Sequence, residues 1–560
     1  MVVADMILSM LEWEGVTDFF GYPGTPILPI YNSLRSSRIK HHLPRHEQNA
    51  IFAAMGYSKI SGRVPVVLVT PGPGVANIVG GLLSSQLELL PVLVITASIA
   101  NSQNYRYKIS NLSEIAAVFS TKVYKLNSLG DVMVAFSDIF KDIKDRYTVS
   151  GPFSIEICQR LLLQEVKNSD HLLRSYKLLS LAKRVGVFRK NLKIAVDFPS
   201  SWDFKNFINL FNSSKRPVIL LGRGAVDSGA YRIVRQLSKK FRIPVVHSLL
   251  ATGALDRDDV YNFGLLGLCG DRRSYNVVKH CDLLVIVGAK CHPRTIGPLE
   301  NFAPRALIAR VDLDEYKFRF SVDIRADLNI GCDSALFCKN WLSSVADGYV
   351  NSHSLPKLRP AAPSSGGGPG GLAIEYFFSV LNGITAGKIP VATGIGQNSI
   401  FALKFYSPED PRSFLVSPDF AAMGFGLPAA IGASIATARG PVIVIDGDGS
   451  FQMSMQELAT LAELDLPILI CILNNRCLGL IKENERRMFG PGPFFVGLKN
   501  PDFVRLASAF GIEAGSISSD GEVESTLTSV FGRRRPYLLE VKLSSNHSTV
   551  GNHVKFNRKL

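Results

Sequence analysis

The residues best suited to chemistry in this 560-residue chain are Asp448 and Asn475, which lie 27 positions apart. Carboxylate and amide oxygens are the ligands that Mg²⁺ prefers, and the ion commonly reaches substrate phosphates through only a few protein groups. The pair therefore predicts a divalent cation that holds a diphosphate. Either residue alone, each in a turn-like segment, would more often be part of a turn with no ligand.

The surrounding sequence indicates how the two side chains meet. A β-branched run from Val442 to Ile445 is typical of a buried strand and stops at the glycine turn that contains Asp448. Residues 453–464 have helical spacing, and the apolar residues 467–473 indicate a second strand. In a strand–helix–strand unit of this kind, both strands end at one edge of a parallel sheet. N–H groups at the start of a helix after Ser450 would face the phosphates.

This segment resembles the signature of thiamine diphosphate (ThDP) enzymes, in which GDG is followed after a fixed interval by NN. The resemblance implies that Asp448 and Asn475 bind Mg²⁺, with the backbone carbonyl of Cys477 as a third ligand. It also places the following residues at the cofactor: Gly396, Gln397, Asn398, Met423, Gly447, Gly449 and Ser450. Met423 matches the apolar residue that bends the cofactor and brings its reacting groups together.

Thiamine chemistry also needs a carboxyl group upstream. The thiazolium carbon must lose a proton, and the aminopyrimidine acts as the base only in an imino form that a carboxyl group at its N1′ promotes. Glu47 is the candidate, because Arg45-His46-Glu47-Gln48 opens a predicted helix. In isolation, a glutamate in a first helical turn is more often a solvated partner of the helix dipole.

Longer segments extend the resemblance to the acetohydroxyacid (acetolactate) synthase large-subunit family over nearly the whole chain. They read FGYPGTPILPIY, RHEQNAIFAAMGYSKISG, TPGPGVANIVGG, MGFGLPAAIGA and GDGSFQMSMQELATL. The resemblance implies decarboxylation of a 2-keto acid, with pyruvate expected, and ligation of the acyl unit to a carbonyl acceptor. It also implies a homodimer or homotetramer in which Glu47 of one subunit meets Asp448 of another.

Positions associated with the acceptor depart from that family. Its FQE motif reads Leu112-Ser113-Glu114, the second glycine of YPGG is Thr25, and Asn484 stands where the family has a tryptophan. Three alternatives therefore stay open. The first is a ThDP enzyme that ligates a two-carbon unit to a keto sugar nucleotide. The second is a 2-keto acid decarboxylase or 2-hydroxyacyl lyase, and the third is a catalytically silent partner subunit.

Alternating strands and helices predict an α/β protein with three doubly wound parallel-sheet domains. We expect a pyrimidine-binding domain at residues 1–163, a central Rossmann-like domain at 202–342 and a diphosphate-binding domain at 372–560. The Pro/Gly/Ser-rich residues 359–371 are typical of an exposed linker.

The central domain carries Gly222-Arg223-Gly224 after a strand, and a lone GxG is a weak nucleotide signal. In acetolactate synthases this domain binds FAD in a structural role. The corresponding GxRFDDR-like loop here reads GAKCHPRTIG, with Lys290 in place of one arginine, Arg294 retained and the paired acids missing. The resemblance therefore leaves FAD binding open.

Composition restricts the classes of partner. A hydrophobic content of 46% with 19% charged residues is ordinary for a globular protein. The net charge of +15 is spread along the chain without a nucleic-acid-binding motif, which predicts no nucleic-acid partner. Eight cysteines without a CxxC pair, an N-terminus without a basic leader and no apolar run of membrane length predict a cytoplasmic protein without a membrane partner.

Overall fold

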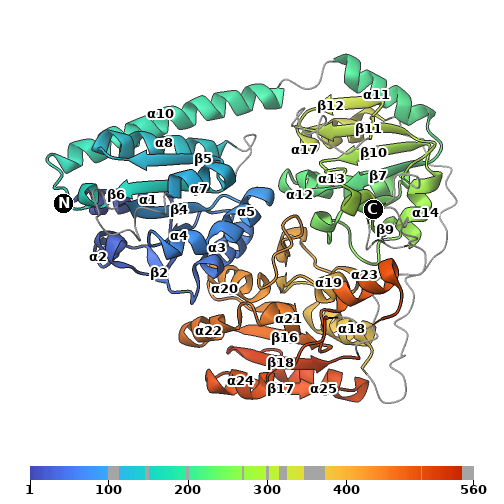
Figure 1. Cartoon of the computed structure of the whole chain (residues 1–560). Helices are drawn as coiled ribbons and strands as arrows, with labels where there is room; N and C mark the ends of the chain where they lie inside the picture. Colours follow the sequence, from blue (N-terminus) through green and yellow to red (C-terminus); the bar gives the residue numbers. More distant parts are fainter. Residues whose placement is uncertain are drawn as a thin grey trace.

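The computed structural model shows three parallel sheets of six strands each, with helices against their faces (Figure 1). It describes residues 1–98, 112–145, 151–196, 201–267, 270, 272–297, 302–313, 324–345, 372–492 and 495–544. Strands that are buried on both faces need apolar residues at every position. The sequence therefore shows short runs of Val, Ile and Leu and not an alternation of apolar and polar residues. The predicted α/β class with three doubly wound parallel sheets is confirmed.

The first sheet has the strand order β2-β1-β3-β4-β6-β5. Its strands are β1 (Asp18–Gly21), β2 (Lys40–His42), β3 (Val66–Leu68), β4 (Leu93–Ser98), β5 (Lys122–Leu126) and β6 (Phe153–Cys158). Its helices are α1 (Val3–Glu14), α2 (Leu28–Leu34), α3 (Glu47–Ser61), α4 (Pro73–Asn77), α5 (Val79–Leu87), α7 (Leu112–Phe119), α8 (Leu129–Lys144) and α9 (Gln159–Leu162). The glutamate predicted to open a helix is the first residue of α3.

Two long helices, α10 (Ser169–Val196) and α11 (Ser201–Ser213), lead to the second sheet, whose order is β12-β11-β10-β7-β8-β9. Its strands are β7 (Pro217–Leu221), β8 (Val245–His247), β9 (Asn262–Leu265), β10 (Leu283–Val287), β11 (Leu307–Asp312) and β12 (Leu328–Gly331). Its helices are α12 (Arg223–Asp227), α13 (Ala230–Phe241), α14 (Arg272–His280), α15 (Pro293–Ile296) and α17 (Ser334–Ser344). The edge strands β9 and β12 escape prediction because Asn and Gly interrupt their apolar pattern.

The third sheet has the order β14-β13-β15-β16-β18-β17. Its strands are β13 (Val391–Thr393), β14 (Phe414–Leu415), β15 (Val442–Gly447), β16 (Ile468–Asn474), β17 (Glu513–Ile517) and β18 (Tyr537–Lys542). Its helices are α18 (Ile374–Thr385), α19 (Gln397–Phe405), α20 (Gly426–Ala436), α21 (Asp448–Phe451), α22 (Leu458–Leu464), α23 (Gly479–Phe489), α24 (Phe503–Ala509) and α25 (Asp520–Val530).

The predicted strand–helix–strand unit is present, since β15 and β16 pair in parallel, but its helical part differs from the prediction. The helix begins at Asp448, ahead of the predicted helical residues 453–464, and ends after one turn. The backbone N–H groups of Met453 and Ser454 bond to carbonyls three residues back, and this tighter pattern breaks the helix before α22. The predicted linker at 359–371 lies outside the described residues, and the three domain ranges stay predictions.

Helices α3 and α20 join the first and third sheets through close backbone contact. A Cβ on Gly432 would clash with the Ala53 carbonyl, and one on Gly56 would clash with the Ala429 carbonyl. Phe52 packs edge-on against Phe425 with ring centroids 5.4 Å apart. Small residues on both helices therefore let one apolar core span the two sheets.

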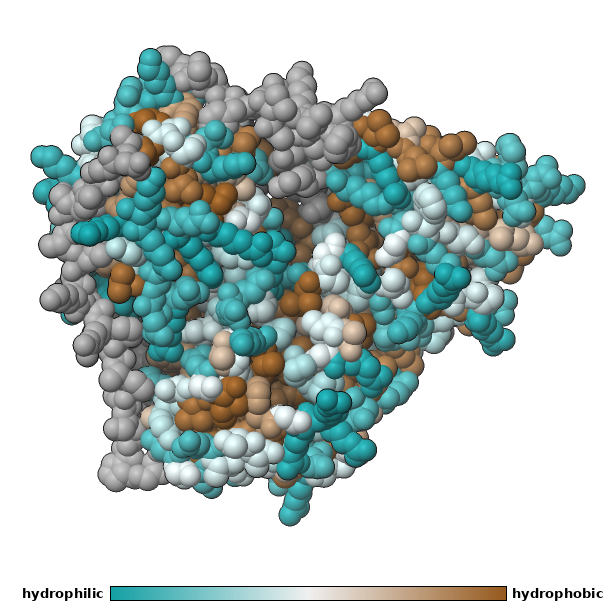
Figure 2. All heavy atoms as spheres, turned by 180° about the vertical axis from the view of Figure 1, so that it is seen from behind, coloured by the Kyte–Doolittle hydropathy of each residue, from teal (hydrophilic) through white to brown (hydrophobic). Residues whose placement is uncertain are grey.

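The surface seen in Figure 2 mixes hydrophobic residues in small groups with hydrophilic ones. In the described part of the chain, no helix is both long and apolar enough to cross a membrane. Helix α23 is unusual because none of its residues is buried. Ile481, Met488 and Phe489 on α23 and Phe495 after it are exposed hydrophobic side chains.

Candidate active site

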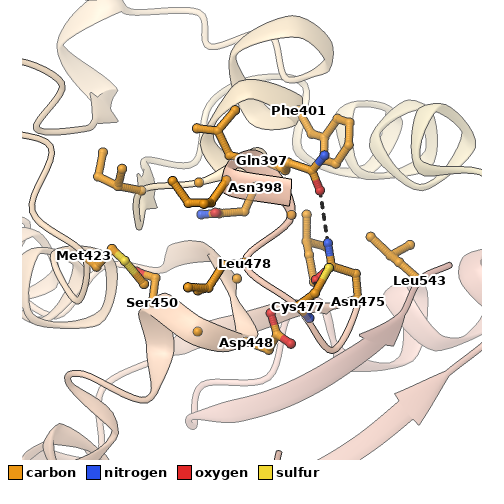
Figure 3. A pocket seen from close by; sticks show the side chains of 18 of the residues that line it. Gln397, Asn398, Phe401, Met423, Asp448, Ser450, Asn475, Cys477, Leu478 and Leu543 are labelled. Atoms are coloured by element: carbon orange, nitrogen blue, oxygen red, sulfur yellow. Dashed lines mark hydrogen bonds between the residues drawn. The ribbon is translucent and has the colours of Figure 1, made fainter. Parts of the chain in front are cut away.

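A pocket of about 230 Å³ lies at the carboxyl ends of β13, β15 and β16, where ligands bind in open parallel sheets. With the exception of Glu47, every residue predicted for the site lines it, as Figure 3 shows for the labelled members. These residues are Gly396, Gln397, Asn398, Met423, Gly447, Asp448, Gly449, Ser450, Asn475 and Cys477. The structure thus gathers four separate sequence segments around one cavity.

Asp448 is the first residue of α21 and is almost fully buried. Burial raises the pKa of its carboxyl group, and a hydrogen bond from Asn500 partly opposes that effect. The Asn500 amide donates to Asp448 Oδ2 at 2.7 Å, and Gln452 donates to the Asp448 backbone carbonyl at 3.0 Å. A buried carboxylate whose side-chain partner is a neutral amide is suited to a cation in the pocket, because the cation would supply the missing positive charge.

Asn475 reaches the same pocket from the end of β16 (Figure 3). Its side-chain amide donates to Gln397 Oε1 at 3.0 Å, and its Oδ1 accepts the backbone N–H of Cys477 at 3.1 Å. Arg476 between them has a φ of 57°, in the left-handed region. This turn of the backbone lets both Asn475 and Cys477 line the pocket.

Asn474, the first asparagine of the pair, does not line this pocket. It is buried, donates to Glu540 Oε1 at 2.6 Å and accepts the Asn500 amide at 2.9 Å. The two neighbouring asparagines therefore play different parts: Asn474 fixes the end of β16 against β18 and the loop that carries Asn500, and Asn475 faces the cavity.

The glycines of the turn keep the pocket floor open. A Cβ on Gly449 would lie 2.8 Å from Leu478 Cδ2, and one on Gly447 would lie 3.1 Å from Asn398 Oδ1. Asn398 in turn donates to the Ile445 carbonyl at 3.2 Å and so supports the end of β15. A side chain at either position would crowd Leu478 or Asn398, and its absence suits a site where phosphate oxygens approach main-chain N–H groups.

Met423 lies at one side of the pocket beside Ser450 (Figure 3). A Cβ on Gly449 would lie 3.6 Å from Met423 Cε, so the methionine overhangs the glycine turn. The Gly424 N–H donates to Ser450 Oγ at 2.9 Å and fixes the Met423 loop to the first turn of α21. Apolar residues that the sequence analysis missed complete the wall: Ile395, Phe401, Ala421, Leu473, Leu478, Leu480, Ile481 and Leu543.

Asp446 lies beneath the turn and was also missed. It is fully buried, and burial raises the pKa of its carboxyl group to about 7, although hydrogen bonds from Ser450 and the Gly447 N–H act in the opposite direction. Gly394 and Gly426 pack so tightly on this carboxyl that a Cβ at either would clash with it. Asp446 therefore supports the loops below the pocket and does not line it.

Glu47 is the one predicted residue that the structure does not bring to the pocket. Its Oε2 accepts the Asn77 amide at 2.9 Å, and Gly74 lies beside its Oε1. All pocket-lining residues lie between 395 and 543, in the third sheet and its loops. Within one chain, the described residues thus place the diphosphate-type pocket and Glu47 at different sites.

The cavity fits a diphosphate bridged to Mg²⁺. Carboxylate and amide oxygens of Asp448 and Asn475 match a hard cation, and the glycine turn exposes main-chain N–H groups to an anion. The described residues contain no cluster of three His, Cys, Asp or Glu side chains that could hold a metal ion alone. A magnesium ion here would need phosphate oxygens or water in addition, as is usual for this ion.

Family comparisons agree with this geometry. The model of the thiamine pyrophosphate enzyme N-terminal TPP binding domain matches residues 1–118, that of the central domain matches 204–340, and that of the C-terminal TPP binding domain matches 394–541. The chain belongs to the thiamine pyrophosphate enzyme family.

Curated relatives of this ThDP-dependent enzyme span nearly its full length. It is 30% identical to the probable acetolactate synthase large subunit of Methanocaldococcus jannaschii over 96% of the chain and 91% of the relative. It is 28% identical to the acetolactate synthase isozyme 2 large subunit of Escherichia coli K12, over 96% of the chain and 95% of the relative. It is also 30% identical to acetolactate synthase 3 of Brassica napus, over 96% of the chain and 83% of the relative.

In the central domain of the enzyme, Arg223 and Lys290 contact acidic residues of the other two domains. Arg223 bonds to the backbone carbonyl of Glu88 and lies 3.7 Å from its carboxylate. Lys290 pairs with Asp419 at 3.4 Å. Gly222 and Gly288 contact each other's loops through backbone atoms. The Arg223 and Lys290 contacts tie the second sheet to the first and third sheets.

Two of the three acceptor-associated side chains, Thr25 and Asn484, lie within the described residues. Thr25 begins a short 3₁₀ turn, Thr25–Ile27, and Asn484 is exposed on α23. The side chain of the acceptor-associated Ser113 on α7 lies outside the described residues, as does that of Arg294 on α15 in the loop associated with FAD. Neither Thr25 nor Asn484 lines the pocket.

Proposed function

We propose that this enzyme uses ThDP and Mg²⁺ to decarboxylate a 2-keto acid and to ligate the acyl unit to a carbonyl acceptor. Pyruvate is the proposed donor. The observation that supports this most directly is the convergence of Asp448, Asn475 and the Gly447–Ser450 turn on one pocket. Relatives named acetolactate synthase at about 30% identity over 96% of the chain support the same class of reaction.

Each part of the pocket has a separate task in this proposal. Asp448 Oδ, Asn475 Oδ1 and the Cys477 carbonyl would hold Mg²⁺, and the N–H groups of the glycine turn would face the diphosphate. Met423 would pack against the bent cofactor. When bound, ThDP would supply a nucleophilic carbon for decarboxylation of the keto acid.

Glu47 is proposed to act at the pocket of a second subunit. Its carboxyl group would hold and exchange the proton at N1′ of the aminopyrimidine. Among the described residues, none from the first sheet lines the pocket, which supports placing Glu47 of one chain at the pocket of another. The exposed apolar side chains of α23, which borders the pocket, suit a subunit contact beside it. A homodimer is the smallest such assembly, and a homotetramer would contain it.

Three alternatives concern the acceptor and turnover. Thr25 and Asn484 differ from the acetolactate synthase pattern, which favours testing bulky acceptors such as a keto sugar nucleotide. Simple decarboxylation or 2-hydroxyacyl cleavage would need the same pocket and no acceptor. A catalytically silent subunit would bind ThDP and Mg²⁺ without turnover. FAD binding stays open, and no proposed step uses a flavin.

Product analysis tests the proposal. Purified protein is incubated with ThDP, Mg²⁺ and pyruvate, CO₂ release is followed, and products are identified by mass spectrometry with and without added carbonyl acceptors. We expect CO₂ release that depends on both ThDP and Mg²⁺, and a ligated product. Aldehyde without a ligated product would support a decarboxylase, and cleavage of a 2-hydroxyacyl substrate would support a lyase. ThDP binding without turnover on any keto acid would contradict the enzymatic proposal.

A further inference from the structure

Asn500 lies more than 20 residues beyond the NN motif and connects the two segments that carry the proposed metal ligands. Its Nδ2 donates to Asp448 Oδ2 at 2.7 Å and to Asn474 Oδ1 at 2.9 Å. One amide group thus bridges the residue at the start of α21 and the residue before Asn475. Because Asn500 holds one oxygen of the Asp448 carboxylate, it restricts rotation of that carboxylate.

The loop that carries Asn500 is itself fixed along the metal segment. Leu478 N–H donates to the Val496 carbonyl, and Leu498 N–H donates to the Arg476 carbonyl, both at 2.9 Å. Cys477 and Gly497 face each other in an antiparallel bridge between these bonds. Residues 496–500 therefore run as a short clamp beside residues 476–478, which include the proposed carbonyl ligand.

Gln452 fixes the other side of the Asn500 amide. Its Nε2 donates to Asn500 Oδ1 and to the Asp448 carbonyl, both at 3.0 Å. With its oxygen engaged by Gln452, the Asn500 amide must direct its NH₂ group toward Asp448. The three residues form a closed set of hydrogen bonds that sets both the backbone and the carboxylate of Asp448.

We propose that Asn500 is a positioning residue for the Mg²⁺ site, which orients the Asp448 carboxylate through its amide and links it to the Asn474-Asn475 segment. This inference rests on the proposed function, because it assumes that Asp448 binds Mg²⁺. Residues that orient a metal ligand typically change metal affinity about 10- to 100-fold when they are replaced.

The test measures metal binding directly. In the full-length protein with saturating ThDP, free Mn²⁺ is quantified by electron paramagnetic resonance during titration. Asn500→Leu keeps the size of the side chain and removes the donor. We expect its Mn²⁺ dissociation constant to rise about 10- to 100-fold. The Mg²⁺ concentration for half-maximal turnover should rise in parallel, with kcat at saturating Mg²⁺ within about threefold of the wild type.

Two further variants separate positioning from folding. Gln452→Leu leaves Asn500 in place but removes its support, and should give a smaller rise in the same constant. Lys499→Ala changes an exposed neighbour in the same loop and should bind Mn²⁺ as the wild type does. If Asn500→Leu fails to fold, Gln452→Leu and the shorter donor variant Asn500→Ser carry the test.

The outcomes distinguish this inference from the proposed function. Wild-type protein that binds no Mn²⁺ with ThDP would refute the proposed function and this inference together. Wild-type binding with unchanged dissociation constants in folded Asn500→Leu and Gln452→Leu would refute only the positioning role. Loss of thermal stability without a change in metal dependence would show that the hydrogen bonds serve the fold alone.

Discussion

At the scale of single residues, side chains of the same type near the pocket have different surroundings. Asp446 is buried beneath the turn, and Asp448, two residues later, lines the cavity. Likewise, Asn474 bonds to Glu540 away from the pocket, and Asn475 lines the pocket. Asp448 and Asn475 thus face the pocket, whereas Asp446 and Asn474 are buried at the ends of β15 and β16.

Glu47→Gln tests the role of the predicted carboxyl group. Glutamine retains the shape and can still accept a hydrogen bond, but it cannot exchange a proton at N1′. We expect turnover to fall by at least about 100-fold. The ThDP dissociation constant should stay within about tenfold, or about 1.4 kcal/mol. Steady-state kinetics and a ThDP titration measure the two effects.

A matched control for this variant is Glu463→Gln, which removes an exposed carboxylate paired with Arg45 at 2.6 Å. It should leave turnover unchanged, since exposed ion pairs contribute little and this one lies outside the pocket. Unchanged turnover in Glu47→Gln would remove Glu47 from its proposed role.

At the scale of secondary-structure elements, the contact of α3 with α20 depends on glycine. Gly432→Ala would drive a methyl group into the Ala53 carbonyl, a backbone atom that cannot move without separating the helices. We expect a loss of about 1–3 kcal/mol in the free energy of unfolding, typical of overpacking. Chemical denaturation of wild type and variant measures the difference.

Gly383→Ala in α18 supplies the matched control. A Cβ at this exposed position would meet nothing within 4 Å. Alanine is the better helix former, so this variant should be as stable as the wild type or more stable by up to about 1 kcal/mol. Equal destabilisation by both alanines would show that the α3–α20 contact is not the cause.

Helix α10 is tied to α1 and α8 by a buried ionic cluster around Glu14. The carboxylate accepts Lys144 Nζ at 2.5 Å, Tyr176 OH at 2.9 Å, Ser180 Oγ at 2.6 Å and Arg184 at 2.6 Å. Burial raises the pKa of Glu14, but these hydrogen bonds outweigh it and hold the pKa below its usual value of 4.5. The carboxylate therefore stabilises the fold above about pH 4.5 and loses this effect as pH falls through the lower, folded-state pKa.

Glu14→Gln should consequently destabilise the protein at pH 7, and the difference from wild type should shrink as pH falls below about 4.5. Urea unfolding at pH 7 and at a pH below about 4.5 measures this change. Glu524→Gln, on the exposed side of α25, should show little difference at either pH. A Glu14→Gln effect that stays constant across this range would contradict the assigned role of the cluster.

The elements and the pocket differ in how far sequence predicts them. Apolar runs such as Val442 to Ile445 predict central strands because burial on both faces demands them. GDG and NN predict pocket residues because their spacing is local. Asn500 escaped prediction because its contact with Asp448 joins residues far apart in the sequence, and Gln452, although in the GDGSFQM segment, has a contact that its residue type alone does not reveal. The early end of α21 escaped it because helical spacing continues through the break.

At the scale of the whole molecule, ion pairs and helices join the three sheets. Glu88 of the first sheet's α5–β4 loop contacts Arg223 of the second and the Asp419 N–H of the third, and α3 packs on α20. These contacts position the first sheet beside the third within one chain, yet Glu47 does not reach the pocket lining. This separation is the reason for proposing that Glu47 acts at the pocket of a second subunit.

Subunit mixing tests this last inference. Glu47→Gln and Asp448→Asn proteins, each inactive alone, are mixed in equal amounts and allowed to exchange subunits. In a two-fold dimer whose sites take Glu47 from one chain and Asp448 from the other, each mixed dimer has one site with both native residues. Random exchange makes about half of the dimers mixed, so activity should recover to about one quarter of wild type. If each chain builds its own site, every site keeps one defect and no activity returns, which would contradict the shared site.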